Sequence, residues 1–368
     1  MHIKISKTSL SEALNNVATV VTAKTSLPVL QNVKIEAKDG KATFVCSDLD
    51  TTLFANADCE VEEDGATTIP VKTFAAAVSK VVDGIVELEV SDKDVAKLTA
   101  GTSKFKFNGI AAKEFPTWKE EEGTSATLSC AAIREMLRKT SFAMCADDTR
   151  RNLNSVLFDF SQGGGKTIAV ATDGRRLALL NCIVEISNGF DSKFVLPRKA
   201  VETLVKKLPK DGDCTLVSYG NQLKFSTPKL SLLTKLIDDA YPNYAQVVPK
   251  TSNEKIVVDR VELAGAIDRI SVFTSVTDSP TMVLAFADNK IVVSVGETEY
   301  GSARDEVPIK YEGEKIEIRF NPNYVRDVLN VIDDDEVEIL LTNGSSPAII
   351  RQVGSEDYTY VVMPVRNI

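Results

Sequence analysis

One structural pattern occurs three times along this chain of 368 residues. Each third begins with a strand-like segment that runs directly into a helix-like segment: IKISKTSLSEALNNV, ATLSCAAIREMLRKT and IVVDRVELAGAIDRI. Apolar residues recur in each helix at the i, i+4, i+7 spacing of one helical face. They are Leu10, Leu14 and Val17, then Ile133, Leu137 and Thr140, then Leu263, Ile267 and Ile270, with Thr140 as the weak member. A repeated pattern predicts a repeated domain, so we expect three copies of one unit.

A second helix follows a proline in each third, at Pro70, Pro197 and Pro322. Proline suits a helix start because its missing N–H would have no partner there. Alternating strands with Gly or Asn at their turns lie between the two helices, and more strands follow. Each unit therefore has the order β-α-β-β-β-α plus further strands, which is an α+β fold with two helices on antiparallel sheet. The predicted domains are residues 1–123, 124–250 and 251–368.

The ends of a row of such units predict self-association. Three units in a row leave one open sheet edge at each end, and open edges invite pairing. A two-fold head-to-tail dimer that joins the first unit of one chain to the last unit of the other closes both edges. The expected assembly is a homodimer ring of six units.

Charge is unevenly distributed among the three domains. The net charge of -9 is made up of -5, +6 and -10 for the successive thirds. Eight basic residues of the middle third lie on or beside its two predicted helices, at Arg134, Arg138, Lys139, Arg198, Lys199, Lys206, Lys207 and Lys210. Lysine and arginine side chains that contact phosphates without reading bases give sequence-independent binding, so duplex DNA is the expected partner. Ordinary scatter of surface charge is the competing interpretation.

The composition argues against an enzyme and against a membrane protein. His2 is the single histidine, so serine–histidine or cysteine–histidine catalysis and histidine metal clusters are not expected. The segment QGGGKT resembles a phosphate-binding loop but has Phe160 where the first glycine belongs. Asp48 and Asp173 occupy equivalent places in the repeat, which predicts a structural role in turns. The six cysteines show no paired spacing and predict buried free thiols. We therefore expect no cofactor, no metal and a cytoplasmic location.

Four motifs make the sequence similar to a known family. They are SLPVLQNVKIEA near the start, VATDGRRLAL in the middle, YPNYAQVVP at the end of the second third, and YVVMPVR near the C terminus. Together with the threefold repeat, they resemble bacterial sliding clamps, the β subunits of DNA polymerase III, over the whole chain. The resemblance implies a non-catalytic ring that encircles duplex DNA and tethers the replicative polymerase. It also implies docking of the clamp loader and of other replication and repair proteins that carry a clamp-binding motif.

The resemblance further implies three sets of site residues. For DNA they are Lys24, Arg150, Arg151, Arg198 and Lys199. For a hydrophobic cleft that takes partner peptides they are Leu153, Thr172, Gly174, Arg175, Arg176, Leu177, Pro242, Val247, Val361, Val362, Met363, Pro364 and Arg366. For the dimer interface they are Phe105 and Phe107 against Val272 and Phe273. The sequence departs from many relatives at Arg175, often histidine there, and in its last residues, Asn367 and Ile368, so its peptide preference is expected to differ.

Two other functions compete with the clamp. One is a repeat scaffold that binds proteins without DNA, and the other is an enzyme that uses carboxylates alone. The basic middle third favours DNA over the scaffold. For the apolar cleft residues and for Phe105 and Phe107, packing inside the domain core is the competing explanation.

Overall fold

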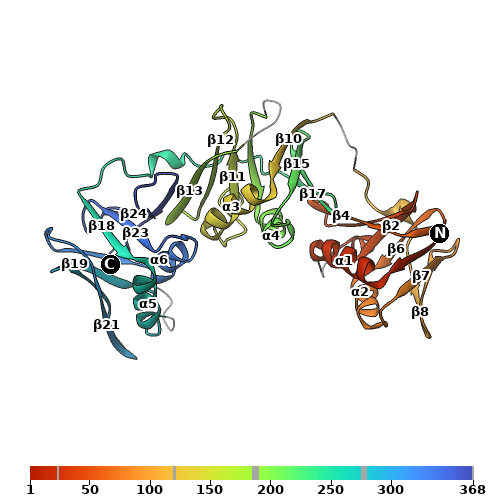
Figure 1. Ribbon diagram of the computed structural model, residues 1–368, viewed down its shortest axis with the longest axis horizontal. Helices are drawn as coiled ribbons and strands as arrows, with labels where there is room; N and C mark the ends of the chain where they lie inside the picture. Colours follow the sequence, from red (N-terminus) through yellow and green to blue (C-terminus); the bar gives the residue numbers. More distant parts are fainter. Residues whose placement is uncertain (23–24, 119–121, 185–189, 275–279, 367–368) are drawn as a thin grey trace. The chain divides into compact units, whose positions relative to one another are not determined.

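The computed structural model describes residues 1–22, 25–118, 122–184, 190–274 and 280–366. The backbone forms two compact units. The first consists mainly of residues 1–131 and 202–236, and the second mainly of residues 132–184, 191–201 and 237–366. Each unit contains two antiparallel sheets, and the middle third of the chain contributes strands to both units (Figure 1).

The first unit has a five-stranded and an eight-stranded sheet. In spatial order, the five-stranded sheet contains β5 (Glu60–Glu63), β1 (His2–Ser6), β7 (Ile85–Val90), β8 (Val95–Ala100) and β9 (Ser103–Asn108). The eight-stranded sheet contains β10 (Thr124–Ser129), β15 (Asp213–Ser218), β16 (Gln222–Ser226), β17 (Leu230–Lys235), β4 (Thr51–Asp58), β3 (Lys41–Ser47), β2 (Asn32–Lys38) and β6 (Gly65–Pro70).

The second unit has an eight-stranded and a four-stranded sheet. The eight-stranded sheet contains β14 (Lys193–Pro197), β11 (Ser155–Asp159), β12 (Lys166–Thr172), β13 (Arg176–Ile183), β25 (Tyr358–Val362), β24 (Ala348–Gln352), β23 (Glu336–Leu341) and β18 (Glu254–Asp259). The four-stranded sheet contains β21 (Gly301–Pro308), β20 (Lys290–Thr298), β19 (Met282–Ala287) and β22 (Ile316–Phe320).

Six α-helices occur in the described residues, two in each third as expected. They are α1 (Lys7–Val17), α2 (Val71–Lys80), α3 (Cys130–Thr140), α4 (Arg198–Lys207), α5 (Arg260–Ser271) and α6 (Pro322–Leu329). Short 3-10 helices span Ala18–Val20, Pro28–Gln31, Ala112–Glu114, Ser141–Ala143 and Tyr244–Gln246. The chain is thus an α+β protein made of three tandem domains. Four strands lie between the two helices of the second and third domains and five between those of the first, whereas the sequence pattern suggested three.

Local chemistry explains where the helices begin and which face they bury. The side chains of Ser6 and Asp259 accept hydrogen bonds from the backbone N–H groups of Ser9 (3.0 Å) and Glu262 (2.8 Å), which caps α1 and α5. The prolines differ in detail, because Pro70 and Pro197 end strands just before their helices whereas Pro322 is the first residue of α6. All nine residues of the predicted apolar helix faces are buried, Thr140 included, and its hydroxyl donates to the Met136 carbonyl at 2.6 Å.

Each eight-stranded sheet is continuous across the join of two domains. β17 of the second domain pairs with β4 of the first, with Leu232 opposite Leu53. β13 of the second domain pairs with β25 of the third, with Leu177 opposite Val361. The domains are therefore joined edge to edge by backbone hydrogen bonds. Such a joint is stiffer than a flexible linker.

Candidate functional site

The turn between β12 and β13 contains the predicted cleft residues Gly174 and Arg175, and two more, Thr172 and Arg176, flank it. The Asp173 carboxylate accepts hydrogen bonds from the backbone N–H groups of Arg175 (2.8 Å) and Arg176 (3.0 Å). Gly174 has a φ of +86°, a conformation that favours glycine. In the equivalent turn of the first domain, Asp48 accepts from the N–H groups of Asp50 (3.1 Å) and Thr51 (2.7 Å). The predicted structural role of both aspartates in turns is confirmed.

Arg176 is held inside the protein rather than at a rim. Its side chain is 10% exposed and forms ion pairs with Asp173 (3.1 Å) and Asp327 (2.6 Å). It also donates to the Phe142 carbonyl at 2.7 Å, and its guanidinium lies 4.5 Å from the centre of the Tyr324 ring. Burial lowers the pKa of Arg176, but the nearby Tyr360 and Asp327 more than offset this, so the pKa is raised. Arg176 therefore positions the turn, and the exposed Arg175 beside it is the arginine that a ligand can reach.

Replacing Arg176 with alanine is expected to destabilise the second unit. The change leaves Asp327 and the Phe142 carbonyl without this partner, and breaking a buried ion pair costs roughly 3 kcal/mol. Arg175→Ala is the matched control, because an exposed substitution costs about 0.5 kcal/mol or less. Denaturant unfolding followed by circular dichroism measures both. Equal stability of the two variants would contradict a positioning role for Arg176.

The C-terminal segment lies against this turn. Strand β25 pairs with β13 so that Val362 is opposite Arg176. The chain then continues along the turn, where the Met363 N–H donates to the Arg175 carbonyl at 2.9 Å. The Val365 N–H donates to the Arg319 carbonyl at 2.8 Å. These contacts place Met363 and Pro364, both half-buried, next to the turn.

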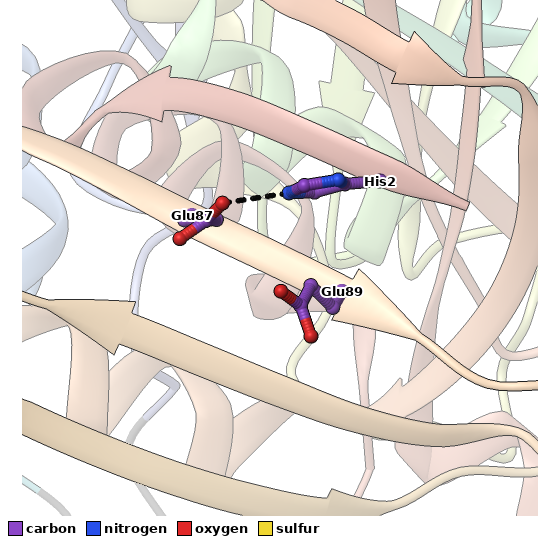
Figure 2. A group of neighbouring side chains, drawn as sticks. All are labelled: His2, Glu87 and Glu89. Carbon is purple, nitrogen blue, oxygen red and sulfur yellow. Dashed lines mark hydrogen bonds and ion pairs between the residues drawn. The ribbon is translucent and has the colours of Figure 1, made fainter.

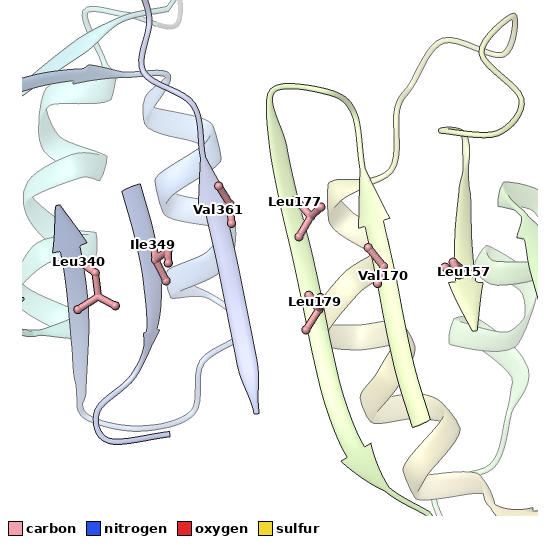
Figure 3. Packing of buried hydrophobic residues seen from close by; sticks show 7 residues of the cluster. All are labelled: Leu157, Val170, Leu177, Leu179, Leu340, Ile349 and Val361. Atoms are coloured by element: carbon pink, nitrogen blue, oxygen red, sulfur yellow. The ribbon is translucent and has the colours of Figure 1, made fainter. Parts of the chain in front are cut away.

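A cluster of buried hydrophobic residues lies on one face of the eight-stranded sheet of the second unit, the sheet that contains β13 and β25 (Figure 3). This sheet-face cluster combines second-domain and third-domain residues: Leu157, Val170, Leu177, Leu179, Leu340, Ile349 and Val361. The segment 237–250 crosses it, with Tyr241, Tyr244 and Val248 packed against the cluster. The Tyr241 hydroxyl donates to the Val170 carbonyl at 3.2 Å, and burial raises its pKa well above the usual tyrosine value.

Besides the half-buried Arg176, Met363 and Pro364, the predicted cleft residues are either buried or exposed. Five are buried and belong to the framework: Leu153, Thr172, Leu177, Val361 and Val362. Gly174, Arg175, Pro242, Val247 and Arg366 are exposed, with Val247 at 42%. The Asn152 side chain donates to the Ala240 carbonyl at 3.3 Å, which ties the loop before Leu153 to the segment that carries Pro242. The structure thus brings two loops and the C-terminal segment to one region of the second unit.

Sequence reasoning missed several residues in this region. Leu340 and Ile349 lie in the sheet-face cluster, and their place in the apolar strands EVEILL and AIIRQ was the available signal. Tyr324 was also missed, although its interaction with Arg175 raises the pKa of that arginine. No sequence signal connects Tyr324 with Arg175, because the two lie in different domains.

The residues predicted to contact DNA have different surroundings. Lys24 lies outside the described residues. Arg150 and Arg151 are exposed in the loop before β11, where Arg150 donates to the Asp173 carbonyl at 3.3 Å. Arg198, by contrast, hydrogen-bonds the Asn154 side chain and donates to the Cys145 carbonyl at 2.8 Å, so it braces this loop. Lys199 is half-buried in the first turn of α4.

The positive charge of the middle helices is partly neutralised, which sequence counting did not predict. Arg138 pairs with Glu135 at 2.9 Å and with Asp333 at 2.5 Å. Lys139 is buried and pairs with the same Glu135 at 3.1 Å. Asp333 is 67% exposed and still forms this ion pair with Arg138. Lys206 and Lys210 remain exposed.

The residues predicted for the dimer interface lie at sheet edges. Phe105 and Phe107 are on β9, the last strand of its sheet. Phe107 is 7% exposed and packs edge-on against Phe74, with ring centres 5.3 Å apart, so it belongs to the core of its own domain. Val272 is 68% exposed just after α5, and Phe273 lies beside Gly301 at the start of the edge strand β21.

The features that suggested other chemistry have structural explanations. Gly163, Gly164 and Gly165 of QGGGKT all have positive φ in the turn between β11 and β12, so the segment is a hairpin turn and not a strand-to-helix phosphate loop. All six cysteines are free thiols, and four of them are buried while Cys59 and Cys182 are half-buried. Burial raises the pKa of Cys182 to about 11, so it is protonated at neutral pH.

Three family models match successive parts of the chain. Residues 1–119 match the N-terminal domain of the DNA polymerase III beta subunit, residues 127–243 its central domain, and residues 245–366 its C-terminal domain. The chain belongs to the DNA polymerase III beta subunit family. It is a clamp subunit and not an enzyme. The predicted boundaries near residues 123 and 250 stay predictions.

Individual relatives of this clamp subunit match it from end to end. The beta sliding clamp of Pseudomonas putida is 30% identical over 370 residues and covers all of both chains. The beta sliding clamp of Chlamydia pneumoniae is 27% identical over 367 residues, with all of this chain and 99% of the relative covered. The resemblance read from the four motifs is thus confirmed over the full length.

Solved structures agree with the fold of the clamp subunit. The DNA polymerase sliding clamp from Bacillus subtilis has a TM-score of 0.95 at 26% identity, with all of both chains covered. A sliding clamp from Pseudomonas aeruginosa bound to griselimycin has a TM-score of 0.94 at 29% identity, again over both whole chains. In the described part of the clamp subunit, no helix is long and apolar enough to cross a membrane.

Proposed function

We propose that this sliding clamp of DNA polymerase III encircles duplex DNA as a head-to-tail homodimer and tethers the replicative polymerase through a peptide cleft in its second unit. The observation that carries the proposal is the repeated edge-to-edge joint between domains. DNA polymerase and clamp loader are the proposed protein partners, together with other proteins that carry a clamp-binding motif.

The two joints within the chain use equivalent strands of the repeat. In each joint, the last strand of one domain (β17 or β25) pairs with the third strand after the first helix of the preceding domain (β4 or β13). The equivalent strands that form no joint within the chain are β9, the last strand of the first domain, and β21, the third strand after the first helix of the third domain. Both are at an edge of their sheet in the described part of the chain. A second copy that pairs its β21 with this β9 would repeat the same joint twice and close a ring of six domains.

Exposed cations support sequence-independent binding of DNA. Arg150, Arg151, Lys206 and Lys210 are solvent-exposed, whereas Arg138, Lys139 and Arg198 are engaged within the protein. A small number of exposed cations gives weak contacts with DNA phosphates, and their affinity falls as the salt concentration rises. Weak contacts allow sliding, and retention then depends on the closed ring rather than on affinity.

The region around the turn at Asp173 supports the peptide cleft. It combines exposed apolar residues, Pro242 and Val247, with the half-buried Met363 and the exposed Arg175. A flexible methionine next to fixed aliphatic groups suits hydrophobic anchor side chains, and an exposed arginine suits carboxylates or carbonyls. The related P. aeruginosa clamp binds griselimycin, so a ligand site exists in a clamp of this fold.

Topological linkage distinguishes a ring from an ordinary DNA binder. The clamp, loaded on nicked circular duplex by a bacterial clamp loader with ATP, should co-elute with the circle in gel filtration at a salt concentration that abolishes direct binding. Cutting the circle once should release it, because a ring slides off a free end. A clamp that is retained equally on circular and linear DNA, or on neither, would contradict the ring and favour a protein scaffold.

A further inference from the structure

The solvent face of the five-stranded sheet gathers His2 with several glutamates (Figure 2). His2 on β1 is directly opposite Glu89 on β7, and Glu87 lies two residues along the same strand. Alternation on a strand places these three side chains on one face, because Ile3, Val86 and Leu88 between them point into the core. One nitrogen of His2 and one oxygen each of Glu87 and Glu89 lie within 4.8 Å of one another.

An irregularity in the pairing of β1 with β5 brings in a third carboxylate. His2 is opposite Glu63 and Ile3 is opposite Val61, so Glu62 is the extra residue of a bulge. A bulge re-aims the side chain of its extra residue. The Glu62 carboxylate lies 2.8 Å from His2 Nδ1, and it also pairs with Lys4. Glu62 therefore holds the imidazole ring with Nε2 toward Glu87.

The two ring nitrogens of His2 cannot both be satisfied by a neutral imidazole. Nδ1 faces Glu62 at 2.8 Å and Nε2 faces Glu87 at 2.7 Å, and both partners are acceptors. Neutral histidine carries a single N–H, so its second nitrogen would direct a lone pair at a carboxylate oxygen. A metal ion on the Nε2 side would be coordinated by that lone pair and by the Glu87 carboxylate together.

We infer that this face is a Zn²⁺ site in which His2 Nε2, Glu87 and Glu89 are the protein ligands and Glu62 orients the histidine. Zinc accepts imidazole nitrogen and carboxylate oxygen at about 2.0–2.2 Å, which separates tetrahedral ligand atoms by roughly 3.3 Å. The 2.7 Å contact between Nε2 and Glu87 must open by about 0.6 Å for the ion to enter, which the Glu87 side chain, 34% exposed, has room to do. A histidine whose other nitrogen donates to a carboxylate is the usual arrangement around bound zinc.

The surroundings leave room and negative charge for the ion. An open hollow of about 250 Å³ is lined by His2, Glu63 and Glu89 among others, so water can complete the coordination. Lys97 lines the same hollow and Lys4 pairs with Glu62, so two lysines partly offset the carboxylates of Glu62, Glu63, Glu87 and Glu89. The ion would connect β1 with β7, which ties the first strand of the chain to its sheet.

Calorimetric titration with zinc chloride tests this inference. The full-length protein, without a histidine tag and stripped with EDTA, should bind one Zn²⁺ per chain in mildly alkaline buffer, because metal binding displaces protons from its ligands. His2→Gln and Glu89→Gln each remove a ligand and should weaken binding tenfold or more. Glu62→Gln removes only the orienting carboxylate and should weaken it by about tenfold. Zinc should raise the melting temperature of the unaltered protein but not that of His2→Gln.

Two controls distinguish zinc binding at this site from binding at the cysteines and from nonspecific binding. Glu63→Gln alters the same hollow without removing a proposed ligand, so its zinc affinity should stay within about twofold of the unaltered protein. Co²⁺ at this site should give weak d–d absorption without the intense near-ultraviolet band of a thiolate ligand. The inference is overturned if the unaltered protein binds no stoichiometric zinc, or if His2→Gln binds zinc as tightly.

Discussion

A chain that lacks residues 363–368 should no longer bind partner peptides, while its fold and its dimer are kept. The truncation removes Met363 and Pro364, which lie beside the turn at Asp173, and leaves β25 intact because that strand ends at Val362. Loss of a central apolar contact typically costs 2 kcal/mol or more, and a few such losses weaken binding by about a hundredfold or more. Fluorescence anisotropy with a labelled clamp-binding peptide from a bacterial polymerase measures the loss.

The matched control is a chain that ends at Arg366. It keeps the hydrogen bonds of Met363 to Arg175 and of Val365 to Arg319, so its peptide affinity should be nearly unchanged. The longer truncation loses those two backbone hydrogen bonds, which contribute about 1 kcal/mol each, so its melting temperature should fall only slightly. Unchanged peptide affinity in the longer truncation would show that the cleft is elsewhere, even if the ring assembly is right.

The double substitution Phe105→Ala with Phe273→Ala should convert the proposed dimer largely to monomer. Phe105 is half-buried on the edge strand β9, and Phe273 lies at the start of the edge strand β21. Alanine in place of an interface aromatic often costs about 2 kcal/mol, so two such losses, about 4 kcal/mol, should raise the dimer Kd by roughly a thousandfold. Sedimentation velocity across a dilution series measures the shift.

Phe107 and Ile183 provide two different controls for the dimer. Phe107 packs against Phe74 within its own domain, so Phe107→Ala should lower the melting temperature through a loss of about 3 kcal/mol. Ile183 is 80% exposed in the middle domain. Ile183→Ala should change neither the melting temperature nor the oligomeric state seen in sedimentation. If the Phe105 and Phe273 double variant sediments as a dimer at every concentration, the proposed joint between β9 and β21 is wrong.

The helices, their buried faces and the domain repeat could be predicted from the sequence because they depend on residues close together in the chain. The spacing of Leu10, Leu14 and Val17 predicted the buried face of α1, and all three are buried. The aspartate turns at Asp48 and Asp173 were also local, since each carboxylate accepts from residues two and three positions later. Family motifs then extended the prediction to candidate sites.

Side-chain partners that lie far apart in the chain could not be read in this way. Arg138 looked like a DNA contact, but it pairs with Asp333, 195 residues away. Arg176 looked like a cleft residue at a rim, but it is held by Asp327 and Phe142. Both arginines are held by residues of the third domain, and the sequence around each arginine gives no sign of those distant partners.

Local periodicity was thus enough for the three domains, their helices and their buried faces, because each follows from interactions within a few residues. The pairing of β4 with β17 and of β13 with β25 was decided only by the tertiary structure, because it joins strands that are far apart in the sequence. His2 illustrates the difference most clearly. As a single histidine it suggested no metal site, yet strands β1, β5 and β7 bring three glutamates to it from 60 and more residues away.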